Sequence, residues 1–107
     1  MQTPKKYRHL LGKSVKVNDH KEAGFVAAVD RRKGITVEDI DGNQLICLNR
    51  ADFKRAGSLY YYQQIFDLLI EAIRKGRINT QQIYKESGYI MELNRRPFQR
   101  TSQCAFK

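Results

Sequence analysis

The chain has 107 residues, of which 41% are hydrophobic and 10% aromatic. A chain of this length can form one modest hydrophobic core but not two. Its hydrophobic and aromatic content excludes wholesale disorder. Lys and Arg outnumber Asp and Glu by 20 to 11, and the resulting net charge of +9 favours an acidic partner such as nucleic acid. We therefore expect one folded domain over residues 1–107.

Signals for export or membrane insertion are not found in the sequence. The stretch MQTPKKYRHLLG lacks the apolar region of a signal peptide, and the longest aliphatic run, residues 68–70, is too short to cross a bilayer. The two cysteines, Cys47 and Cys104, have no spacing typical of a disulfide framework or a zinc site. We expect a cytoplasmic protein that does not bind membranes.

The order of apolar and polar residues over about residues 14–50 is typical of a small β-sheet. The segments SVKV and GITVEDI alternate apolar and polar residues, whereas GFVAAVD and QLICLN are apolar on both faces. Gly34 in DRRKG and DGN at 41–43 are turn signals between them. Strands that are apolar on both faces need cover on both sides. The prediction is a small curved antiparallel β-meander or an SH3-like barrel.

Two pieces within residues 12–43, GKSVKV and AGFVAAVDRRKGITVEDIDGN, resemble SH3-like small barrels of the KOW type. That family begins Gly-x-x-Val-x-Val and continues Gly-x-Val-x-x-Val before a basic turn. Its members commonly bind RNA, DNA or other proteins, so the resemblance implies a partner of one of these kinds.

A linker or single helical turn, NRADFKRAG, precedes the clearest helix of the sequence, expected over about residues 59–75. Ser58 is a typical N-cap and Gly76 a typical residue just after a helix end. A helical period places five apolar residues on one face of this helix: Tyr62, Ile65, Phe66, Leu69 and Ile73. We expect this face to pack against the strands, which predicts an α+β fold. On the same helix, Tyr60 should face water, while Tyr61 and Leu68 lie on the flank.

Short helices and a basic tail are expected over about residues 80–107. The segment IYKESGY resembles the middle of helix-turn-helix sequences, a resemblance that covers residues 80–96. It implies that Ile83 packs inward, that Gly88 makes the turn, and that Ile90 and Leu93 anchor a second helix. The alternative is that Asn79 or Thr80 caps a short packing helix, which Gly88 ends.

Catalytic chemistry is not indicated by the sequence. His9 and His20 are isolated, and no glycine-rich phosphate loop occurs. Three acidic residues, Glu38, Asp39 and Asp41, resemble a magnesium-binding set, but they lie at a hairpin turn where Asp is favoured by local hydrogen bonding. We expect a protein that is not an enzyme and has neither a cofactor nor a metal site.

Basic residues carry the functional hypothesis, which is non-enzymatic binding of DNA or RNA through phosphate contacts. A further basic set, Lys5, Lys6 and Arg8, lies near the N-terminus. The candidate nucleic-acid-binding residues are Arg31, Arg32, Lys33, Arg50, Lys54, Arg55, Arg95, Arg96 and Arg100.

The alternative hypothesis is a protein-interaction module, a regulatory or inhibitory subunit from a mobile genetic element. Its partner-binding surface would be the flank of the long helix, at Tyr60, Tyr61 and Leu68. In one version of this alternative the partner is a second copy of the chain, and the flank forms a homodimer.

Overall fold

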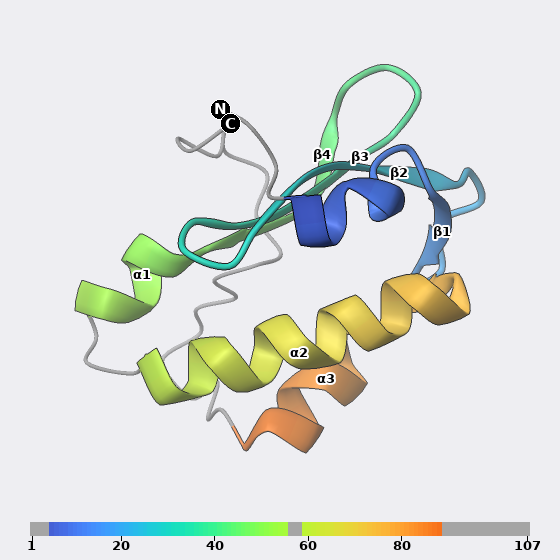
Figure 1. The fold of residues 1–107 in the computed structure, drawn as a ribbon. Coiled ribbons are helices and arrows are strands. Elements are labelled where there is room, and N and C mark those ends of the chain that lie inside the picture. The colour runs from blue at the N-terminus through green and yellow to red at the C-terminus, as the bar shows by residue number, and fades with distance from the viewer. Residues whose placement is uncertain (1–4, 56–58, 89–107) are drawn as a thin grey trace.

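The computed structural model describes residues 5–55 and 59–88, without the side chains of residues 54 and 55. The fold belongs to the α+β class, as the sequence predicted (Figure 1). Along the chain its elements are a 3-10 helix η1 (Lys5–Leu10), β1 (Ser14–Val17), β2 (Gly24–Asp30), β3 (Gly34–Glu38), β4 (Gln44–Asn49), α1 (Arg50–Arg55), α2 (Leu59–Lys75), β5 (Arg77–Ile78) and α3 (Thr80–Ser87).

The sheet has five strands in the order β4-β3-β2-β1-β5. Its first four strands form the predicted antiparallel meander. The sheet is curved but does not close into a barrel. The fifth strand, β5, runs parallel to β1 and was not predicted, because two residues are too few to show a strand period.

Gly34 fixes the turn between β2 and β3. Its φ is +140°, and a Cβ built there would lie 1.6 Å from the carbonyl oxygen of Leu48 on β4. The backbone of β4 therefore approaches β3 at a distance that only glycine permits. This explains in physical terms why a glycine follows the basic run at 31–33.

The core lies between the sheet and α2, which runs beneath the sheet in Figure 1. All five residues that the helical period placed on the inner face of α2 are buried, which confirms that prediction. Burying a large apolar side chain contributes about 1.5–3 kcal/mol. Gly76 ends the helix with φ +85°, and its amide donates to the carbonyl oxygens of Ala72 and Ile73.

The capped short helix predicted after residue 79 is α3. The Asn79 side chain accepts a hydrogen bond from the Gln82 amide, and Gly88 ends the helix with φ +80°. Ile83 is buried, as the helix-turn-helix resemblance implied. The expected N-cap Ser58, and the second helix of the helix-turn-helix prediction with Ile90 and Leu93, lie outside the described residues.

Cys47 is buried in β4 and disulfide-bonded. The other cysteine of the sequence, Cys104, lies outside the described residues. The spacing of the two cysteines gave no sign of a disulfide, so this bond was not predicted from the sequence. In the described part of the chain, no helix is both long enough and apolar enough to cross a membrane.

Candidate nucleic-acid interface

The β2–β3 turn presents three consecutive cations, Arg31, Arg32 and Lys33, whose side chains are exposed. Asp30 organises this turn. Its side-chain carboxylate accepts a 2.8 Å hydrogen bond from the Arg32 amide, and its carbonyl oxygen accepts one of 3.0 Å from the Lys33 amide. The backbone geometry of the turn is therefore fixed before any ligand arrives.

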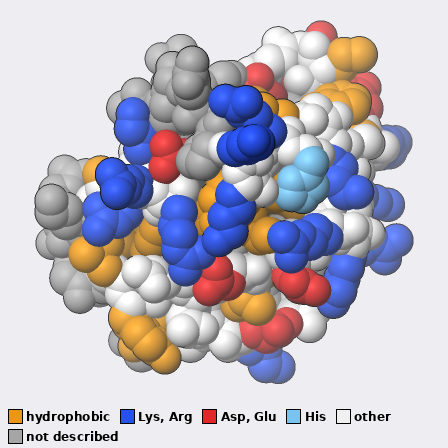
Figure 2. Space-filling view, viewed as in Figure 1, with side chains coloured by type: hydrophobic (Ala, Val, Ile, Leu, Met, Phe, Trp, Pro, Cys, Tyr) orange, Lys and Arg blue, Asp and Glu red, His pale blue; other side chains and the backbone are white. Residues whose placement is uncertain are grey.

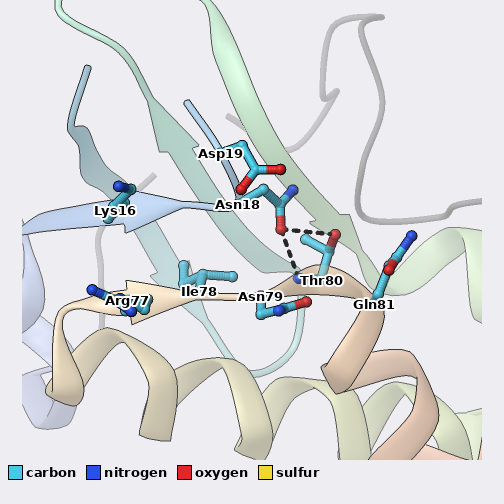
Figure 3. Close-up of a pocket in the computed structure, with 8 residues that line it drawn as sticks. All are labelled: Lys16, Asn18, Asp19, Arg77, Ile78, Asn79, Thr80 and Gln81. Atoms are coloured by element: carbon cyan, nitrogen blue, oxygen red, sulfur yellow. Dashed lines mark hydrogen bonds between the residues drawn. The ribbon is translucent and has the colours of Figure 1, made fainter. Parts of the chain in front are cut away.

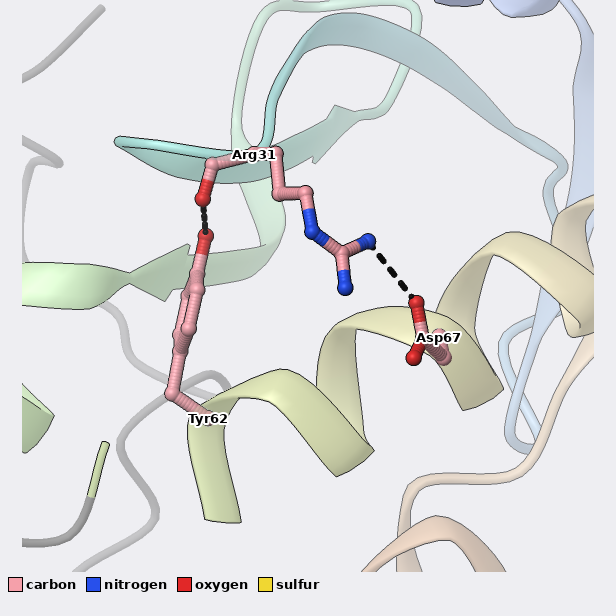
Figure 4. Close-up of polar contacts among 3 residues, drawn as sticks. All are labelled: Arg31, Tyr62 and Asp67. Atoms are coloured by element: carbon pink, nitrogen blue, oxygen red, sulfur yellow. Dashed lines mark hydrogen bonds and ion pairs between the residues drawn. The ribbon is translucent and has the colours of Figure 1, made fainter. Parts of the chain in front are cut away.

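Arg31 differs from its two neighbours because it is held against α2 (Figure 4). Its Nη1 atom lies 3.0 Å from a carboxylate oxygen of Asp67. Its guanidinium carbon lies 5.3 Å from the ring centroid of Phe66. Its backbone carbonyl oxygen accepts a 2.7 Å hydrogen bond from the Tyr62 hydroxyl. Arg31 therefore anchors the turn, and this reduces its availability to a phosphate.

The pKa values of Arg31 and Tyr62 are consistent with Arg31 as the anchor of the turn. The hydrogen bond that Arg31 donates to Asp67 raises the pKa of Arg31, and its hydrogen bond with the Tyr7 hydroxyl raises it further. Burial raises the pKa of Tyr62 well above its ordinary value. At neutral pH the Arg31 guanidinium therefore stays charged and the Tyr62 hydroxyl stays protonated, as their hydrogen bonds require.

The helix η1 lies next to this anchor. The Tyr7 ring packs edge-on against Phe66, with 5.7 Å between the ring centroids, so Phe66 contacts both η1 and Arg31. Lys6 places its Nζ atom 5.5 Å from the Tyr7 ring centroid. Three cations of η1, Lys5, Lys6 and Arg8, are exposed.

The start of α1 also lies against the β2–β3 turn. The Arg50 amide donates a 2.8 Å hydrogen bond to the carbonyl oxygen of Lys33, which places the first residue of α1 against the turn. The Asn49 side chain accepts from the Ala51 amide at 3.0 Å and starts the helix. The segment expected as a linker or single turn is therefore the helix α1, and the Arg50 side chain is half-buried.

Cations from three segments thus converge, and Figure 2 shows Lys and Arg side chains gathered over η1 and the β2–β3 turn, with acidic side chains over α2. We call this set the basic face: Lys5, Lys6, Arg8, Arg32, Lys33 and Arg50. Sequence reasoning placed the η1 cations outside the candidate site, although their spacing around an apolar Tyr7 was a usable signal.

The remaining predicted cations are not placed on this face. The structure describes no side chain for Lys54 or Arg55, whose backbone belongs to α1. Arg95, Arg96 and Arg100 lie outside the described residues.

The flank of α2 is only partly exposed. Tyr60 is 69% exposed, and its ring packs edge-on against Tyr61. Tyr61 and Leu68 are half-buried against the core. A Cβ built on Gly88 would lie 3.9 Å from the Tyr61 ring, so the chain directly after α3 approaches this tyrosine. The surface proposed for a protein partner is therefore used in part for internal packing.

The acidic set at 38–41 has the geometry of a turn. One carboxylate oxygen of Asp39 accepts hydrogen bonds of 2.9 Å from the amides of Asp41 and Asn43. These bonds, the Asn43 amide first, lower the pKa of Asp39. Within residues 5–55 and 59–88, no group of His, Cys, Asp or Glu is arranged to hold a metal ion.

No protein-family model, curated protein or solved structure matches the chain.

Proposed function

We propose that the protein is a non-enzymatic nucleic-acid-binding protein whose basic face contacts phosphate groups of DNA or RNA. The observation that carries this proposal is the convergence of cations from three segments: η1 and the β2–β3 turn both pack on Phe66, and the half-buried Arg50 at the start of α1 is hydrogen-bonded through its amide to the turn. Clustered cations on a fixed backbone attract a phosphate chain and release its counterions.

Phosphate contact is favoured over base recognition because the two aromatic residues beneath the face, Phe66 and Tyr7, are buried. Tyr7 is 5% exposed, so it cannot serve as a stacking platform for a base. The side chains of Arg32 and Lys33 are exposed and can reach phosphate oxygens. Binding of this kind depends on salt and carries little sequence information.

Fluorescence anisotropy of labelled single- and double-stranded DNA and RNA at several salt concentrations tests the proposal. We expect affinity that falls steeply with salt. In the double variant Arg32→Ala/Lys33→Ala, affinity should fall and the slope of log K against log salt should become shallower by about 1–2, because up to two phosphate contacts are lost.

The matched control is Lys75→Ala/Lys85→Ala, which removes two exposed positive charges from α2 and α3. It keeps the same net charge as the test variant but leaves the basic face intact. Equal loss of affinity in the two variants would show that net charge alone matters. No binding of any of the four ligands at low salt would overturn the proposal.

A further inference from the structure

A hollow of about 450 Å³ lies at the edge of the sheet where β1, β5 and the start of α3 meet (Figure 3). A volume of this size falls in the range that holds small ligands. None of the residues of the basic face lines it. Its lining residues are predominantly polar or charged: Lys16, Asn18, Asp19, Arg77, Ile78, Asn79, Thr80 and Gln81.

Two cations stand side by side at this hollow. Lys16 on β1 and Arg77 on β5 are register partners on neighbouring parallel strands, so their side chains lie on the same face of the sheet. Both side chains are exposed. Within the described residues, the ion pair joins Arg31 and Asp67, and neither Lys16 nor Arg77 takes part in it. Like charges on directly paired strand positions repel each other, and a bound anion would relieve that repulsion.

Asn18 fixes the end of the hollow that is formed by the start of α3 (Figure 3). This residue has φ +49°, and its side-chain oxygen accepts hydrogen bonds from the Thr80 amide at 2.9 Å and the Thr80 hydroxyl at 3.2 Å. Thr80 is 1% exposed, so the contact is protected from water. The start of α3 is thereby fixed against β1, and the polar groups of the hollow are positioned before a ligand binds.

Asp19 adds a carboxylate to the lining. A carboxylate repels a bare anion but accepts hydrogen bonds from hydroxyl or amino groups. The lining therefore combines two cations for an anionic group with one acceptor for a neutral polar group. A small molecule that carries both an anionic group and hydroxyl or amino groups fits this lining better than a free anion.

We propose that the hollow binds a small phosphate monoester, such as a nucleoside monophosphate, with its phosphate between Lys16 and Arg77 and its hydroxyl groups near Asp19. This site is separate from the basic face. Its occupation does not depend on whether the protein binds a nucleic-acid chain.

Amide chemical shifts of the ¹⁵N-labelled full chain test this proposal, with adenosine monophosphate, inorganic phosphate and adenosine as three separate probes. We expect adenosine monophosphate to shift the amides of Lys16, Asn18, Arg77 and Gln81, inorganic phosphate to bind more weakly, and adenosine to leave these amides unchanged. Loss of either cation should weaken the monophosphate affinity about tenfold, because a charge-assisted hydrogen bond is lost.

The variants are Lys16→Ala, Arg77→Ala and the charge-conserving Arg77→Lys, with Lys85→Ala as the control on α3. Retained affinity in Arg77→Lys and Lys85→Ala, together with loss in the two other variants, would support the site. Unchanged affinity in Lys16→Ala and Arg77→Ala would overturn it, as would inorganic phosphate binding as tightly as the monophosphate. Failure of oligonucleotides to bind in the anisotropy titration would leave this result unaffected.

Discussion

The Tyr62 hydroxyl donates a 2.7 Å hydrogen bond to the backbone carbonyl oxygen of Arg31 and so joins the middle of the domain's core to its most basic turn. Tyr62 is 1% exposed, whereas Arg31 is a surface residue. The orientation of the turn is therefore determined from inside the domain. The three cations at 31–33 thus differ: Arg31 is part of the support of the turn, whereas Arg32 and Lys33 are exposed.

Replacing Tyr62 with phenylalanine should destabilise the protein by about 1–2 kcal/mol, because the Arg31 carbonyl loses its partner while the ring packing remains. Urea unfolding followed by circular dichroism measures the change. Tyr60→Phe is the control, since its side chain is 69% exposed and should tolerate the same loss of a hydroxyl. Equal effects in the two variants would contradict the assigned role of the hydrogen bond.

Replacing Asp67 with asparagine should increase the affinity for oligonucleotides about two- to fivefold, because the Arg31 guanidinium loses its carboxylate partner and becomes available to phosphate. Stability should change by less than about 1 kcal/mol, since both partners are substantially exposed. Anisotropy titration at low salt measures the affinity.

The control for this prediction is Glu71→Gln, an exposed position one turn further along α2 that makes the same change in net charge. Only Asp67→Asn should show the full increase. The same gain in Glu71→Gln would mean that the overall charge, and not the release of Arg31, explains the effect.

Replacing Gly34 with alanine should destabilise the protein by more than about 3 kcal/mol, because the added Cβ would overlap the Leu48 carbonyl oxygen and separate β3 from β4. Thermal or urea unfolding measures this. Gly12→Ala also places alanine at a positive φ, +78°, but in open space, and should cost only about 1 kcal/mol. A mild effect at Gly34 would show that the two strands can move apart cheaply.

The sequence predicts much of this fold because many of its signals are local. Alternating valines, turn residues such as Gly34 and the helical period around Phe66 each act over a few neighbouring positions. The parallel pairing of β5 could not be predicted in this way. It depends on Val17 and Ile78, which meet only when the chain between them has folded.

The candidate site was predicted in composition but not in arrangement. A run of three cations can be identified in the sequence, whereas the packing of Arg31 on Phe66 requires that a turn and a helix distant in the chain come together. The pairing of Lys16 with Arg77 was missed for the same reason. In both cases the information lies in long-range contacts, which a single sequence does not display.

The contact between Asn18 and Thr80 also has a consequence for the order in which the protein folds. The two residues are 62 positions apart, so closing this contact costs more chain entropy than closing any hairpin of the meander. The hairpins and α2 can form from local interactions, while β5 and α3 can join β1 only after the intervening chain has become compact. We therefore expect the hollow at this edge to be completed in the last step of folding, and to open first when the protein unfolds in part.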